Sequence, residues 1–150
     1  MDKLKIYLDN CCYNRPFDDL TIEKNWLESN SKMFIQSLIK FKSVSLYYSF
    51  MSQIEIDDSP YEERKAYILD FVETNAVAFI GKSRFAEIEM LSDEIMQTGI
   101  KKKDATHLAC SIIAKCDYFV TTDRGVLNHK TDKIKIINPI KFVEIWRTLL

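Results

Sequence analysis

The chain has 150 residues, with 47% hydrophobic and 29% charged side chains but only three glycines and three prolines. This composition excludes a disordered or fibrous chain and predicts one globular domain, residues 1–150, with its own core. The net charge of −1, from 21 basic and 22 acidic side chains, excludes a general attraction to polyanions. Binding to nucleic acid would need local basic patches such as Lys101–Lys103 or Lys82 with Arg84.

Four cysteines, Cys11, Cys12, Cys110 and Cys116, show no CxxC spacing. This arrangement favours free thiols over a zinc site or a disulfide framework. The amino-terminal residues contain no signal-peptide pattern, and no apolar run reaches the roughly 18 residues of a membrane span. We therefore expect a cytoplasmic protein without membrane contact.

The first half of the chain alternates apolar runs with helical patterns. Residues 4–8 predict a buried strand that ends at Asp9, and residues 44–48 predict a second strand. A turn signal around Pro16 lies between them. It is followed by a long amphipathic helix whose apolar residues recur at helical spacing: Ile22, Trp26, Met33, Phe34, Leu38 and Phe41. A short helix is predicted from Ser49 to near Asp58.

The second half continues the alternation. Ser59 as N-cap and Pro60 at the first helical position predict a helix that reaches about residue 74, followed by a strand at 76–80. A helix with an apolar stripe from Phe85 to Ile95 can end at Gly99. The next helix places small and apolar side chains on one face, which predicts close packing on a sheet: Ala105, Leu108, Ala109, Ile112 and Ile113.

The last two strands are predicted at residues 118–121 and 134–137, with a turn at residues 123–125 between them. A closing helix carries Phe142, Val143, Trp146 and Leu149. The predicted strands are apolar almost throughout and are separated by helices or loops. This pattern favours an α/β fold with a five-stranded parallel sheet covered on both faces.

Acidic residues follow the predicted strands. Asp9 comes after the first strand, Asp123 after the fourth, and Asp104 lies in the first turn of the preceding helix. Each has an ordinary structural interpretation as a turn residue or a helix cap. However, ligands of open parallel sheets bind outside the carboxyl ends of the strands. The three carboxylates can therefore meet at one edge.

Four segments carry a family resemblance: KIYLDNCCYNRPFDD, SFMSQIEIDDSP, KKKDATHLACSIIAKCDYFVTTDRGVL and INPIKFVEI. DATHLA followed by DYFVTTD is the most specific part. With these segments the chain resembles the PIN-domain nucleases, a family that includes many bacterial toxins of toxin–antitoxin pairs. The resemblance implies a three-layer α/β/α sandwich and a metal site formed by Asp9, Glu55, Asp104 and Asp123.

The resemblance also implies that Asn10 and Thr121 support the metal site or orient the substrate. The chain departs from the family after Asp9, where Asn10-Cys11-Cys12 replaces a frequent Ser or Thr. For the second acid, the phrase SQIEI favours Glu55, while the neighbouring Asp57 and Asp58 remain alternatives.

Clustered carboxylates repel one another, and a divalent cation relieves the repulsion. Oxygen ligands favour Mg²⁺ or Mn²⁺, which can activate water for attack on a phosphodiester. The resemblance then implies an endoribonuclease with an RNA substrate, a small antitoxin protein as partner, and self-association into a homodimer as a further option.

Four other side chains have weaker assignments. Arg15 and Arg124 can each bind a substrate phosphate or pair with the acids next to them in sequence. His107 is expected to be a packed or supporting residue rather than a general base, and His129 lies in a polar turn.

Two alternatives remain open. A catalytically inactive PIN-fold module would bind RNA or a protein without cleavage. A phosphoacceptor receiver domain would need an Asp after the central third strand, but residues 76–80 lead instead into Gly81 and Lys82.

Overall fold

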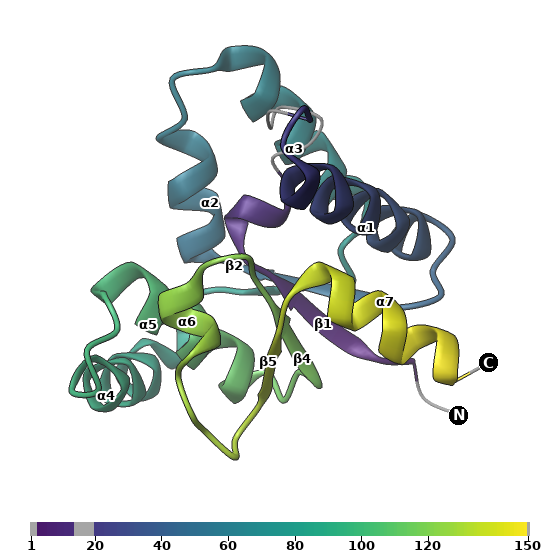
Figure 1. Ribbon diagram of the computed structural model, residues 1–150. Coiled ribbons are helices and arrows are strands. Elements are labelled where there is room, and N and C mark those ends of the chain that lie inside the picture. Colours follow the sequence, from purple (N-terminus) through teal and green to yellow (C-terminus); the bar gives the residue numbers. More distant parts are fainter. Residues whose placement is uncertain (1–2, 14–19, 150) are drawn as a thin grey trace.

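The computed structural model describes residues 3–13 and 20–149 (Figure 1). Five strands form one sheet in the order β3-β2-β1-β4-β5, and every neighbouring pair is parallel. The strands are β1 (Lys5–Leu8), β2 (Ser45–Ser49), β3 (Ala78–Ile80), β4 (Tyr118–Val120) and β5 (Lys135–Ile137). The predicted five-stranded parallel sheet is therefore confirmed.

Seven α-helices connect and cover the strands within the described residues. They are α1 (Glu23–Lys40), α2 (Phe50–Asp57), α3 (Glu62–Asn75), α4 (Phe85–Met96), α5 (Lys102–Ile113), α6 (Arg124–Leu127) and α7 (Pro139–Thr148). Two short 3-10 helices, η1 (Asn10–Tyr13) and η2 (Lys82–Arg84), follow β1 and β3. None of these helices is both long and apolar enough to cross a membrane.

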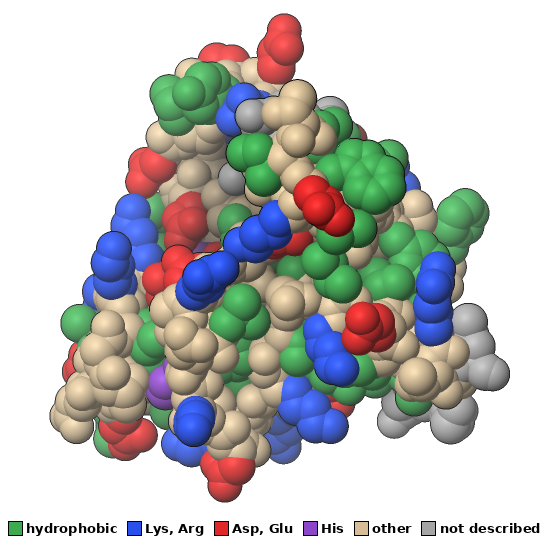
Figure 2. Space-filling model, viewed as in Figure 1, with side chains coloured by type: hydrophobic (Ala, Val, Ile, Leu, Met, Phe, Trp, Pro, Cys, Tyr) green, Lys and Arg blue, Asp and Glu red, His purple; other side chains and the backbone are tan. Residues whose placement is uncertain are grey.

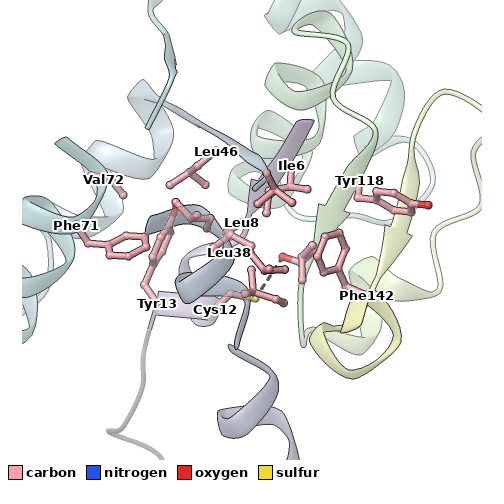
Figure 3. Close-up of a cluster of buried hydrophobic side chains, with 14 of the residues drawn as sticks. Ile6, Leu8, Cys12, Tyr13, Leu38, Leu46, Phe71, Val72, Tyr118 and Phe142 are labelled. Atoms are coloured by element: carbon pink, nitrogen blue, oxygen red, sulfur yellow. Dashed lines mark hydrogen bonds between the residues drawn. The ribbon is translucent and has the colours of Figure 1, made fainter. Parts of the chain in front are cut away.

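The pleat of β1 divides the interior into two cores. Ile6 and Leu8 belong to one core, which contains buried side chains of α1, α3 and α7 (Figure 3). Tyr7 belongs to the other core, with buried side chains of α4 and α5. The helices therefore form one layer on each face of the sheet, and the predicted three-layer α/β/α arrangement is confirmed. The small face of α5 packs on the sheet as predicted, with Ala105 and Leu108 fully buried.

One helix begins at another residue than predicted. The N-cap of α3 is Tyr61 rather than Ser59, because the Ser59 hydroxyl accepts a hydrogen bond from the Tyr61 N–H at 3.3 Å and forms the turn before the helix. The predicted closing helix is α7, which Asn138 caps by accepting from the Lys141 N–H at 2.7 Å. The predicted turn at 123–125 is the start of the short helix α6.

The predicted apolar stripe of α1 is buried only at Leu38. Ile22, Trp26, Met33 and Phe34 are 36% to 51% exposed, and Phe41 at the end of the helix is 83% exposed. Beside Leu38, the buried face contains Ile35 and Ile39 together with the polar side chains of Glu28, Ser29, Lys32 and Gln36. Apolar residues lie on two sides of this helix, and only the side with Ile35, Leu38 and Ile39 faces the core.

All four cysteines are free. The Cys12 thiol is buried in the first core and donates to the Val120 carbonyl at 3.3 Å, which joins η1 to β4 (Figure 3). The turn signal at Pro16 lies outside the described residues.

Two phenylalanines test the assignment of core and surface. Phe142 is fully buried against Tyr118, with ring centroids 5.6 Å apart, whereas Phe41 is exposed. Phe142→Ala should lower the free energy of unfolding by about 3–5 kcal/mol, because it leaves a cavity. Phe41→Ala should change it by less than about 0.5 kcal/mol in urea titrations. A large loss of stability in Phe41→Ala would contradict the observed orientation of α1, which leaves Phe41 exposed.

Candidate metal site at the sheet edge

The candidate site lies where the strand order reverses. From β1 the chain proceeds to β2 and β3 on one side, and it returns to β4 on the other side of β1. Such a reversal opens a crevice at the carboxyl ends of the two strands. Asp9 follows β1, and its backbone N–H donates to the Val120 carbonyl of β4 at 2.9 Å. The first predicted acid is thus held between both strands.

Asp9 is only 7% exposed, and both of its carboxylate oxygens accept a hydrogen bond. The Thr121 hydroxyl donates to Oδ2 at 2.7 Å, and the Asn10 backbone N–H donates to Oδ1 at 2.8 Å. Thr121 Oγ1 also accepts from the Asp123 N–H at 3.1 Å. A hydroxyl at the end of β4 therefore supports Asp9, although no Ser or Thr closely follows Asp9 in the sequence.

Asp104 and Asp123 approach Asp9 from α5 and from the start of α6. Burial raises the pKa of Asp104 from 3.8 to about 6, and the negative charges of Asp9, Asp123 and Glu55 add to this rise, while His107 opposes it. Asp123 is the N-cap of α6 and accepts from the Val126 N–H at 3.2 Å through Oδ1. The charges of Asp9, Asp123 and Glu55 therefore all act on the Asp104 carboxyl.

Glu55 lies on α2 and is half-buried, whereas Asp57 and Asp58 are exposed. The Glu55 carboxylate pairs with His107, with 2.6 Å between Oε1 and Nε2. Neither neighbouring acid makes such a contact within the described residues. Of the three candidates for the second acid, Glu55 is the one that pairs with His107, and its ligand atom lies within 4.8 Å of one of Asp9.

Sequence reasoning did not identify Tyr7. Its hydroxyl lies 2.6 Å from His107 Nδ1, 2.6 Å from Ser49 Oγ and 3.0 Å from Ser52 Oγ. Tyr7 and His107 are both fully buried, and burial raises the pKa of Tyr7 far above 10.0. In the sequence, a tyrosine within an apolar strand is typical of a core residue, and only its hydroxyl suggested a polar partner.

The donors fit a divalent cation. Asp9, Glu55 and His107 each offer one ligand atom, and these atoms lie within 4.8 Å of one another. Asn10 Oδ1 is a buried oxygen without a hydrogen-bond partner in the described part of the chain. Carboxylate and amide oxygens match the preferences of Mg²⁺ and Mn²⁺.

A cleft of about 620 Å³ opens beside these donors and contains both signs of charge. Its lining includes Asn10, Glu55, Asp104 and Arg64, together with Lys101, Lys102 and Lys103. In Figure 2, acidic side chains gather in a hollow that basic side chains flank. Lys102 forms an ion pair with Glu89, with 3.0 Å between Nζ and Oε2, whereas Lys101 and Lys103 form no ion pair with described residues.

The remaining candidates lie elsewhere. Arg124 is exposed and lines a separate depression with Lys24 and Glu28, and it forms no ion pair with Asp123 within the described residues. Arg15 lies outside the described residues. His129 Nδ1 contacts the Thr98 hydroxyl at 3.2 Å, away from the acids.

The raised pKa of Asp104 predicts a pH-dependent stability in metal-free protein. The folded protein holds this proton more tightly than the unfolded chain, so stability falls as the pH rises from about 4 through the folded pKa of about 6. Asp104→Asn should therefore raise the melting temperature by roughly 2–4 °C at about pH 8, and the gain should vanish at about pH 4. Asp57→Asn is the exposed control. An equal shift in melting temperature at both pH values would contradict the raised pKa of Asp104.

Solved structures of similar fold match almost the whole chain. Crystalline VapBC2 from Rickettsia felis, bound to a DNA fragment from their promoter, contains a chain 17% identical with a TM-score of 0.61, covering 90% of this chain and 98% of that one. FitAB bound to an IR36 DNA fragment matches at 16% identity and TM-score 0.57, covering 90% and 95%. FitAcB from Neisseria gonorrhoeae matches at 17% and 0.54, covering 89% and 97%.

No family model and no curated protein matches the sequence. The structural matches are complexes that contain PIN-domain toxins. At identities of 16% to 17% they establish architecture, and they agree with the resemblance seen in the sequence. The chain therefore has the PIN-domain fold.

Proposed function

We propose that this protein is an endoribonuclease that depends on Mg²⁺ or Mn²⁺ and hydrolyses RNA phosphodiester bonds. The observation that carries the proposal is the convergence of Asp9, Glu55 and His107 at the reversal of strand order, where their ligand atoms lie within 4.8 Å of one another. The charges of Asp9, Asp123 and Glu55 also raise the pKa of Asp104. A divalent cation would relieve this repulsion between carboxylates.

The residues have separate tasks in this proposal. Asp9 and Asp123 would be direct ligands, while Glu55 and Asp104 would hold the ion or its waters. A bound cation would supply the charge that neutralises the carboxylates, polarises the phosphate and makes water more acidic. Thr121 and the Asn10 backbone N–H keep the Asp9 carboxylate in one orientation through bonds of 2.7 and 2.8 Å. The Asn10 amide is available to a water or to substrate.

The basic side chains at the cleft suit a polyanionic substrate. Lys101 and Lys103 are exposed beside Asp104 and can contact phosphates, although the whole chain has a net charge of −1. Their placement supports binding of a phosphate backbone at the acids rather than over the entire surface. The assignment to RNA in place of DNA rests on the family resemblance.

We also propose a small antitoxin protein as partner and self-association as a homodimer. The support is the likeness to VapBC2 and FitAB, which are complexes of toxin–antitoxin type. Exposed apolar residues of α1, including Trp26 and Met33, provide area for contact with another protein.

Asp9→Asn should reduce Mn²⁺-dependent cleavage of single-stranded RNA by more than about 100-fold, because a buried ligand loses its charge. The measurement is initial cleavage rate on a fluorescent oligonucleotide, with folding checked by circular dichroism. Asp57→Asn, an exposed acid on α2, should retain full activity. If the folded wild-type protein leaves RNA intact but binds it, the inactive-module alternative holds.

Mn²⁺ should stabilise the folded protein by mass action. At an ion concentration about 100 times Kd, the melting temperature should rise by roughly 5–10 °C. The rise should disappear in the double variant Asp9→Asn with Asp123→Asn, as followed by thermal shift. An unchanged rise in that variant would place the ion at other residues.

A further inference from the structure

A continuous run of buried hydrogen bonds connects the start of α2 to Glu55 through Tyr7 and His107. We propose that Tyr7 is a positioning residue that fixes the proton of His107 on Nε2 and thereby orients the Glu55 carboxylate. This inference rests on the proposed metal-dependent function, because its benefit is an ordered ligand at the cation. It assigns a role to a buried tyrosine that does not line the cleft.

Backbone N–H groups at the start of α2 determine which atom donates and which accepts in each of these hydrogen bonds. Ser49 caps α2, and its Oγ accepts from the N–H groups of Met51 at 3.2 Å and Ser52 at 3.4 Å. A hydroxyl oxygen has two lone pairs, so these donors occupy both. The Ser49 proton must therefore be donated, and the short distance of 2.6 Å assigns it to the Tyr7 oxygen rather than to the Cys110 thiol, the other side chain that this hydroxyl contacts.

The Tyr7 hydroxyl accepts from Ser49 and donates to His107. Its oxygen accepts from Ser49, so its own proton goes to one of the two remaining neighbours, His107 Nδ1 at 2.6 Å or Ser52 Oγ at 3.0 Å. The shorter contact is with His107, and Ser52 can itself donate to Tyr7 because its oxygen accepts from the Ser49 N–H at 3.1 Å. Burial keeps the pKa of Tyr7 far above neutrality, so the phenol remains a donor.

His107 completes the run. If Nδ1 accepts from Tyr7, the imidazole is neutral and carries its proton on Nε2. Nε2 then donates to Glu55 Oε1 at 2.6 Å. The second oxygen of Glu55 accepts no hydrogen bond from described residues and remains available on the side of the cleft.

The opposite arrangement makes a different prediction. If His107 itself ligates the cation through Nε2, its proton must lie on Nδ1 and be donated to Tyr7. Nε2 would then present a lone pair to the Glu55 carboxylate at 2.6 Å, a repulsive contact in the free protein. The hydrogen bonds of α2 thus favour His107 as a support of Glu55 over His107 as a ligand.

The first test determines which nitrogen of His107 carries the proton in metal-free wild-type protein. Long-range ¹H–¹⁵N spectra distinguish a neutral imidazole protonated on Nε2 from one protonated on Nδ1 and from the imidazolium. The chain has two histidines, so His129→Gln assigns the signals. A neutral His107 with its proton on Nε2 supports the inference. A proton on Nδ1, or protons on both nitrogens, overturns it, whether or not the protein cleaves RNA.

The second test removes the Tyr7 hydroxyl. Tyr7→Phe should mix the His107 tautomers and weaken Mn²⁺ binding by about 10- to 100-fold in calorimetric titration. Tyr13→Phe is the matched control, since Tyr13 is equally buried and its hydroxyl has no described partner. It should leave tautomer and affinity unchanged. His107→Gln, which keeps an N–H donor for Glu55, should bind Mn²⁺ more tightly than His107→Leu.

The outcomes separate this inference from the proposed function. If wild-type protein binds Mn²⁺ and Tyr7→Phe binds it equally well, the positioning role is overturned and the metal site stands. If wild-type protein binds no Mn²⁺, the proposed function fails. The tautomer of His107 in the metal-free protein then still shows whether the hydrogen bonds run from Tyr7 through His107 to Glu55. If Tyr7→Phe does not fold, the comparison of His107→Gln with His107→Leu decides.

Discussion

The site depends on a conflict between burial and charge at the carboxyl ends of β1 and β4. Asp9 is almost inaccessible to water, yet both of its oxygens have protein donors, so its negative charge is tolerated. Asp104 accepts no hydrogen bond from described residues, and its pKa rises to about 6. The fold supplies donors to one carboxylate and none from the described residues to the other.

The helices that carry the site are joined by side chains as well as by packing. The hydrogen bonds leave α2 at its N-cap Ser49, cross to Tyr7 on β1 and His107 on α5, and return to α2 at Glu55. This closed path ties both ends of the short helix to the middle of the sheet. Because each member is buried or half-buried, a lost partner would leave an unsatisfied polar group inside the protein.

Sequence reasoning located the ends of β1 and β4 and the acids that follow them. Asp9 and Asp123 could be predicted because apolar runs stop at polar residues, and Glu55 needed the family resemblance. Tyr7 could not be found in this way, because its partners lie 42 and 100 residues away and a tyrosine in an apolar strand looks like core. The face of α1 was mispredicted because apolar side chains occupy two sides of that helix, and periodicity does not decide which side meets the sheet.

The central position of β1 has a consequence for the order of assembly. The hydroxyl that holds Asp9 belongs to Thr121, 112 residues later in the chain. A nascent chain that has not yet reached β4 and the start of α6 lacks this hydroxyl and also Asp123. The hydrolytic centre proposed for this protein therefore cannot form until these residues have been synthesised, because its parts depend on contacts between distant segments.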